Sequence, residues 1–130
     1  MKRVAITAAA IAALAFSPAA LAAGGLSGKY KTKIISDHAL GGSLNGTWTL
    51  DFKPNGTYTV TDDGTIVIRG TFTSTASKIT LSHEKGTAAC PATGRYGYNL
   101  TAQTLKFSRI SDPTCPGRSG VLAHTFKTVG

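Results

Sequence analysis

Apolar and polar residues alternate with a period of two along most of the chain beyond residue 28. In the segment 47–52, Trp48, Leu50 and Phe52 fall on one face, whereas threonines and an aspartate fall on the other. This alternation is typical of a β-strand with one buried face. Because no part of this region sustains a 3.6-residue period, we predict an all-β protein.

The alternation breaks at turn residues, which divide the chain into eight strands. The strands, given by their bounds or apolar positions, are Lys29–Ile35; Thr47–Phe52; Tyr58 and Val60; Ile66, Ile68, Gly70 and Phe72; Ile79 and Leu81; Tyr96, Tyr98 and Leu100; Leu105 and Phe107; and Gly120–Thr128, with Leu122 and Phe126. A meander with one apolar face covers that face, and loses its exposed edges, by closing on itself. We therefore predict an eight-stranded antiparallel up-and-down barrel. Its three long loops, 36–45, 84–94 and 111–119, would lie at one end.

Short turns predict the register of three hairpins. Three-residue turns at 54–56 and 62–64 would each end with a glycine in the left-handed conformation. A two-residue turn at 102–103 would pair residues that lie equally far from it. The pairs expected are Phe52 with Tyr58, Val60 with Ile66, Leu100 with Leu105, and Tyr98 with Phe107.

Cys90 and Cys115 are the only cysteines, and they also lie equally far from the turn at 102–103. The register therefore places them at the far ends of one hairpin, where a disulfide can form. They do not make the C-x-x-C arrangement of a redox-active pair. We expect a single structural disulfide between them.

The N-terminal residues have the pattern of a secretory signal peptide. Lys2 and Arg3 precede an apolar run at 4–16, and Ala20-Leu21-Ala22 provides small residues for cleavage. The run is too short for a permanent transmembrane helix, although an uncleaved anchor is the alternative. We expect residues 1–22 to be removed and residues 23–130 to form one secreted domain, extracellular or in the cell envelope. Contact with a membrane is expected only during export.

The chain carries a formal net charge of +8, but its basic residues are scattered along the sequence. A nucleic-acid-binding surface needs basic residues clustered with aromatic ones, so we expect no nucleic-acid partner. Lys29, Lys31 and Lys33 alternate and would share one face of the first strand. They indicate either a solvated, edge-protecting strand or a contact with an anionic polymer or lipid surface.

Three segments carry a resemblance to a known group of proteins: Gly46-Thr47-Trp48, CPATGRYGYNL at 90–100 and CPGRSGVLAHTF at 115–126. Together they resemble small secreted lipocalin-like (calycin-type) β-barrel proteins of actinobacterial type, which are largely uncharacterised. The resemblance covers most of residues 30–127 and implies fold more than function.

In lipocalins the tryptophan of this motif packs at the closed end, under an arginine or lysine from near the chain end. The resemblance thus implies that Arg118, or alternatively Lys127, stacks on Trp48 and plugs the barrel. The short turn at 54–56 departs from the pattern, because lipocalins have a long loop there at the open mouth.

The predicted interior contains several aromatic residues that could contact a ligand. We assign this role to Trp48, Tyr58, Tyr96, Tyr98 and Phe107, since the tyrosines offer hydroxyls in an otherwise apolar space. The alternative is that these side chains simply fill the barrel, because eight-stranded barrels either pack solid or hold one small ligand.

No catalytic set or metal site can be recognised. His38 and His83 would lie at the long-loop end near Glu84 and Asp112, but their spacing matches no ligand motif. His124 alternates with apolar positions and is expected to point into the barrel. The chain has no G-x-S-x-G nucleophile motif. We therefore expect neither an enzyme nor a bound cofactor.

Three functions remain open on the sequence. The first is a non-enzymatic module that holds a small apolar or amphipathic molecule in the barrel. The second is a protease-inhibitor-like or other protein-binding domain, acting through the arm at 23–30 or the long loops. The third is a structural protein of the cell envelope. The sequence does not indicate an oligomeric state.

Overall fold

The computed structural model describes residues 25–38 and 40–129. The predicted signal peptide, residues 1–22, and the start of the predicted domain lie outside these residues. The described part contains eight strands and one short helix. Their bounds are β1 Gly28–Ile34, β2 Gly46–Phe52, β3 Thr57–Asp62, β4 Thr65–Ser74, β5 Lys78–Lys85, β6 Gly94–Leu100, β7 Thr104–Ser111, α2 Pro116–Leu122 and β8 Phe126–Thr128.

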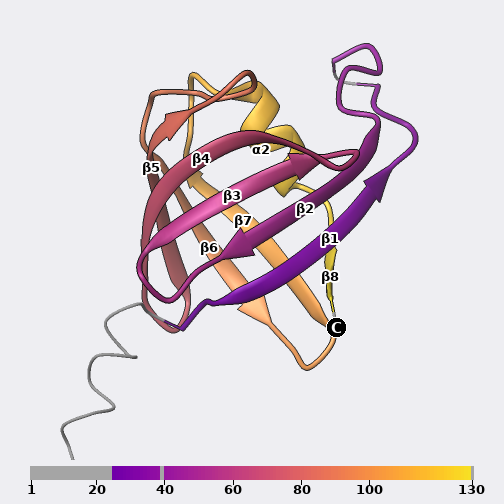
Figure 1. The fold of residues 1–130 in the computed structure, drawn as a ribbon. Helices are drawn as coiled ribbons and strands as arrows, with labels where there is room; N and C mark the ends of the chain where they lie inside the picture. Colours follow the sequence, from indigo (N-terminus) through magenta and orange to yellow (C-terminus); the bar gives the residue numbers. More distant parts are fainter. Residues whose placement is uncertain (1–24, 39, 130) are drawn as a thin grey trace, which may run out of the picture.

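The strands form a closed barrel in sequence order, as predicted. Each strand pairs antiparallel with the next, and β1 also pairs with β8 to close the ring. Since direction reverses at every connection, the three long loops lie at one end (Figure 1). The helix α2 lies across that same end (Figure 1).

Two of the three predicted hairpin registers are confirmed. Phe52 lies opposite Tyr58 across the turn at 54–56, where Gly56 has a positive φ of 86°. In the hairpin of β6 and β7, Leu100 lies opposite Leu105, and Tyr98 lies opposite Phe107.

The register predicted for the turn at 62–64 is wrong. Asp62 pairs with Thr65, so the turn consists of two residues, Asp63 and Gly64, both with positive φ. A bulge then places Val60 opposite Ile68 instead of Ile66. As a result Ile66 leaves the core and is 43% exposed. A two-residue Asp-Gly turn matches the strand twist better than the longer turn we expected.

Alternate residues of the strands point inward and form one apolar core, which begins with Leu26 ahead of β1. Its strand members are Tyr30, Ile34, Trp48, Leu50, Phe52, Tyr58, Val60, Ile68, Phe72, Ile79, Leu81, Tyr96, Tyr98, Leu105 and Phe126. Leu100, which was also expected inside, is 41% exposed because it lies at the rim next to the tight turn. Period-two patterning therefore identifies most of this core.

The last predicted strand, Gly120–Thr128, is wrong in its first half. Residues 116–122 form α2, and only Phe126–Thr128 are extended. Pro116 occupies the first turn of α2, where its missing N–H costs nothing. Arg118, Val121 and Leu122, three and four residues apart, place their side chains on the buried face of α2. The buried residues of α2 have helical spacing. The strand was predicted because Leu122 and Phe126 also fit the alternation of a strand.

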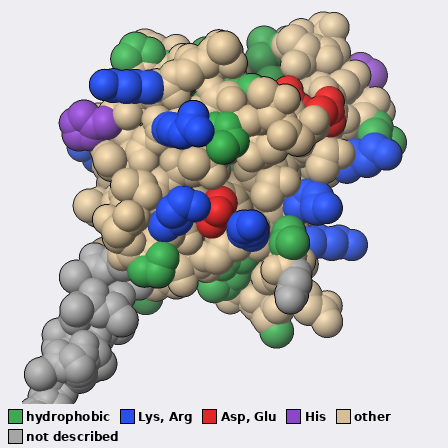
Figure 2. Space-filling view, in the orientation of Figure 1, with side chains coloured by type: hydrophobic (Ala, Val, Ile, Leu, Met, Phe, Trp, Pro, Cys, Tyr) green, Lys and Arg blue, Asp and Glu red, His purple; other side chains and the backbone are tan. Residues whose placement is uncertain are grey.

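The outer face of the barrel is basic. Lys29, Lys31 and Lys33 are all exposed on one face of β1, as predicted, and Lys31 lies opposite Lys127 of β8. Figure 2 shows Lys and Arg spread over this face, with only isolated Asp and Glu between them. Among residues 25–38 and 40–129, no helix is long and apolar enough to span a bilayer.

Candidate functional site

An apolar cavity of about 90 Å³ lies inside the barrel, beneath α2. The strands β2 and β3 supply most of one wall, and Val121 and Leu122 of α2 form the cap. Its apolar lining consists of Leu44, Trp48, Leu50, Phe52, Tyr58, Val60, Ile68, Leu81, Ala88, Val121 and Leu122. The indole of Trp48 is fixed in this wall, since its Nε1 donates a hydrogen bond of 2.8 Å to the carbonyl of Leu44.

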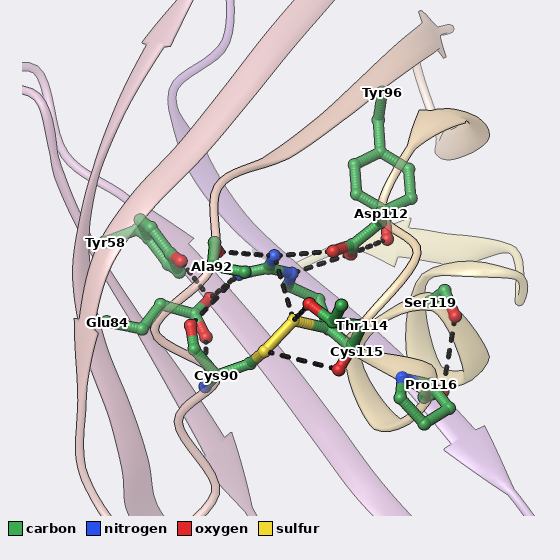
Figure 3. The surroundings of a disulfide bond; sticks show 11 residues. Tyr58, Glu84, Cys90, Ala92, Tyr96, Asp112, Thr114, Cys115, Pro116 and Ser119 are labelled. Carbon is green, nitrogen blue, oxygen red and sulfur yellow. Dashed lines mark hydrogen bonds and ion pairs between the residues drawn. A yellow bond between two sulfur atoms is a disulfide. The ribbon is translucent and has the colours of Figure 1, made fainter.

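One side of the cavity carries a buried charged cluster centred on Arg118. Its Nη2 lies 2.7 Å from Asp112 Oδ1, its Nε donates to Asp112 Oδ2 at 2.8 Å, and its Nη1 lies 3.3 Å from Glu84 Oε2. Glu84 and Asp112 lie on opposite sides of the guanidinium (Figure 3). We refer to Arg118, Glu84 and Asp112 as the buried charge cluster. All three are less than 9% exposed, so each charge depends on the others for compensation.

A backbone carbonyl and a disulfide sulfur complete the coordination of the guanidinium. Nη2 also donates to the carbonyl of Ala92 at 2.7 Å and contacts Cys115 Sγ at 3.3 Å. Burial alone would lower the pKa of Arg118, but the hydrogen bonds with Asp112 and the charge of Glu84 outweigh it and raise that pKa above its usual value. The side chain is therefore a permanent cation inside the barrel.

A backbone irregularity turns Glu84 toward the interior. Along β5 the inward positions are Ile79 and Leu81, so strict alternation would place His83 inside and Glu84 outside. Instead the pairing between β4 and β5 shifts at this point, and His83 adopts a positive φ of 55°. A bulge of this kind reverses the facing of the residues that follow it. Glu84 is buried as a result, and His83 is exposed.

Two tyrosine hydroxyls are bonded to the carboxylates of the cluster. Tyr58 donates to Glu84, and Tyr96 donates to Asp112. Burial raises the pKa of both phenols, and the neighbouring carboxylates raise it further. Both tyrosines thus remain neutral donors. The second oxygen of Glu84 accepts from the backbone N–H of Cys90 at 3.0 Å.

The disulfide between Cys90 and Cys115 is present, as predicted, with the two Cα atoms 6.0 Å apart. Cys115 is the residue immediately before α2, and Cys90 lies in the loop before β6. The bond therefore ties the capping helix to the neighbouring loop, next to the buried charge cluster (Figure 3). A disulfide indicates an oxidising, extracytoplasmic compartment.

The five residues predicted to contact a ligand do not converge on one space. Trp48 and Tyr58 line the cavity. Tyr96 and Phe107 line a separate groove between β7 and α2. Tyr98 lies toward the opposite end, where its hydroxyl donates to the carbonyl of Thr75. Within the described structure, the cavity can therefore involve only the first pair directly.

Trp48 and Arg118 line the same cavity, so they lie at the same end of the barrel as expected. The guanidinium's polar contacts are with carboxylates, carbonyls and a sulfur, while the indole N–H is bonded to Leu44. Stacking of Arg118 on Trp48 stays a prediction.

The histidines take no part in the buried charge cluster. His38 and His83 are exposed, and His124 is half-buried beyond the end of α2 instead of inside a strand. Within residues 25–38 and 40–129, no three His, Cys, Asp or Glu side chains are grouped to hold a metal ion. The sequence therefore indicated the end of the barrel at which these charged residues lie, but it did not identify Glu84 and Asp112 as partners of Arg118.

The spacing Asp112-x-x-Cys115-x-x-Arg118 was the signal available in the sequence, because it brings acid, disulfide and base to the start of one short helix. Comparison of the chain with protein-family models, curated proteins and solved structures finds no match.

Proposed function

We propose that this protein is an exported, non-enzymatic binding module that holds the apolar end of a small molecule in the cavity beneath α2. The observation that carries the proposal is a mainly apolar cavity with one polar cluster at its side. Ligand sites commonly combine an apolar lining with a few fixed polar groups that orient the ligand.

The size of the cavity limits the ligand. About 90 Å³ is less than the 150 Å³ of an engineered cavity that binds benzene, and well below the roughly 300 Å³ of the smallest typical ligand pockets. Only a short apolar group fits, such as the end of an alkyl chain. The rest of the ligand would leave the cavity between Ala88, which is exposed, and Gly117, which is half-buried.

The charge of the cluster limits the polar group of the ligand. Two carboxylates surround one guanidinium, and the guanidinium already bonds to Asp112, Glu84 and Ala92. An anionic headgroup would meet unfavourable charge without a free donor from Arg118. We therefore propose a neutral or basic amphipathic ligand in preference to a fatty acid.

Trp48 offers a direct test, because it is the only tryptophan of the chain and lines the cavity. Its fluorescence is titrated with primary alcohols of increasing chain length and with the carboxylates of equal length. We expect a saturable change with the alcohols and a much weaker one with the carboxylates. Absence of any saturable change with either series would overturn the proposal.

A matched pair of variants locates the binding. Val60→Phe fills the cavity, whereas Val129→Phe makes the same change at an exposed position near the C-terminus. The first variant should lose the saturable change while keeping a cooperative unfolding transition, and the second should keep both. Native mass spectrometry of protein purified from its own host then identifies the natural ligand.

A further inference from the structure

The seam of the barrel between β7 and β1 is short. The strand β8 has three residues, and it pairs with β7 only at Thr104 and Leu105. On the other side of β7, pairing with β6 extends as far as Ser111. Within the described structure, the segment Lys106–Ser111 therefore has no strand on its β8 side. A free strand edge of this kind is a template for pairing with another extended chain.

A groove of about 500 Å³ lies beside this free edge, between β7 and α2. Its apolar part is made by Leu40, Tyr96, Phe107 and Leu122, and Arg109 and small residues of α2 border it. Phe107 and Arg109 are two residues apart on β7 and so lie on the same face. A free strand edge that faces a helix can hold a peptide as an added strand, with pockets for alternate side chains.

The charge at the groove favours an acidic occupant. Arg109, which borders the groove, is exposed and forms no ion pair within residues 25–38 and 40–129. The nearest acidic residue along the chain, Asp112, is buried and bonded to Arg118 and Tyr96. Opposite charge between a groove and its ligand speeds association, disfavours wrongly charged partners and fixes the register.

From this edge, groove and charge we infer that the groove between β7 and α2 binds an extended acidic peptide, added antiparallel to Lys106–Ser111. An apolar side chain of the peptide lies next to Phe107. A glutamate or aspartate two positions earlier in the peptide lies next to Arg109. This site is separate from the cavity beneath α2, so it adds a protein-binding function to the ligand binding proposed above.

A second copy of the chain fits the groove less well. Pairing β7 of one molecule antiparallel with β7 of another would bring the Arg109 side chains of both molecules to the same seam. Like charges across such a seam are unfavourable. Charge therefore favours an acidic peptide over self-association.

Two peptides test the site directly: Ser-Thr-Glu-Thr-Leu-Thr and the same peptide with Lys in place of Glu. Each is titrated into isotope-labelled full chain, and backbone amide shifts are followed by NMR. We expect the Glu peptide to shift the amides of Lys106–Ser111 and of Ser119–Ala123 in a saturable manner. The Lys peptide should bind about tenfold more weakly or worse, since it places like charge beside Arg109.

Charge reversal at Arg109 provides the decisive control. Arg109→Glu should exchange the two peptides, so that the Lys peptide binds and the Glu peptide does not. The matched variant Arg69→Glu changes an exposed arginine on β4, on the far side of the barrel, and should leave the preference unchanged. Three results would overturn the inference: shifts outside the groove, equal binding of both peptides, or shifts that depend on protein concentration alone.

Discussion

At the scale of single residues, Arg118 holds the long-loop end together. Its guanidinium bridges Glu84 and Asp112, which come from different elements and would otherwise be isolated carboxylates in an apolar interior. Removing one member of a buried ion cluster leaves the others without compensation. The stability of this end should therefore depend more on Arg118 than on any exposed basic residue.

Replacing Arg118 with Met should lower the free energy of unfolding by about 3 kcal/mol, because Glu84 and Asp112 remain buried without their cation. Arg118→Lys keeps the charge but loses the paired hydrogen bonds, so it should cost less than Met. The matched change Arg109→Met, at an exposed site, should cost less than about 0.5 kcal/mol. Urea unfolding measures all three, and equal effects of the two Met variants would contradict the account.

The tyrosines give the protein an alkaline limit. Burial raises the pKa of Tyr30, Tyr58, Tyr96 and Tyr98, with a carboxylate adding to the rise at Tyr58 and Tyr96. Unfolded tyrosines titrate near pH 10, so the folded state holds these protons more tightly. The resulting stability is fully present below about pH 10 and is lost as the pH rises further.

An absorbance titration checks this expectation. Tyrosinate should appear together with cooperative unfolding above about pH 10, and not before it. Substantial tyrosinate in protein that is still folded at pH 10 would show that the phenols are accessible, contrary to their burial.

At the scale of elements, two glycines near Arg118 should respond in opposite ways to replacement by alanine. A Cβ on Gly94, the first residue of β6, would lie 2.8 Å from Arg118 Nη2. A Cβ on Gly117, inside α2, would meet no atom within 4 Å. Gly94 thus makes room for the buried charge cluster, whereas Gly117 leaves α2 less stable than alanine would.

Gly94→Ala should therefore destabilise the protein by about 2 kcal/mol through the forced displacement of Arg118. Gly117→Ala should stabilise it by about 0.5 kcal/mol or more through helix propensity. Thermal unfolding of the two variants beside the wild type measures the difference. A loss of stability in Gly117→Ala as large as that in Gly94→Ala would argue against the described packing of α2.

The disulfide acts on the same element, since it fixes the start of α2 to the loop that contains Cys90. Replacing Cys90 and Cys115 with Ser should lower the free energy of unfolding by roughly 3 kcal/mol, on the chain-entropy account of a closed loop. It should also release the cap and weaken alcohol binding in the Trp48 titration. A variant that loses stability but binds alcohols as before would show that fixing α2 in place is not needed for alcohol binding in the cavity.

At the scale of the whole molecule, the barrel could be predicted because local alternation and short turns fix its topology. Pairs such as Phe52 with Tyr58 and Leu100 with Leu105 follow from turn length alone. The helix α2 and the inward turn of Glu84 could not be predicted in this way. Both depend on local departures from strand geometry, a helical turn started at Pro116 and a bulge at His83, which tertiary packing stabilises.

The same limit explains why the residues that line the cavity could be predicted only in part. Alternation indicates which residues point inward, but it does not indicate which part of the interior is left unfilled. Tyr98 is inward yet bonded to Thr75 near the other end, whereas Leu122 reaches the cavity from a helix. Unfilled space is a property of the packed molecule as a whole.

The most direct measurement for the account as a whole is a crystal structure of the protein under xenon pressure. Xenon occupies apolar cavities, so we expect one well-occupied site beneath α2, in contact with Trp48, Val60 and Leu122. That site should disappear in Val60→Phe. Xenon bound only elsewhere, or side chains filling the space beneath α2, would contradict a binding function for this end of the barrel.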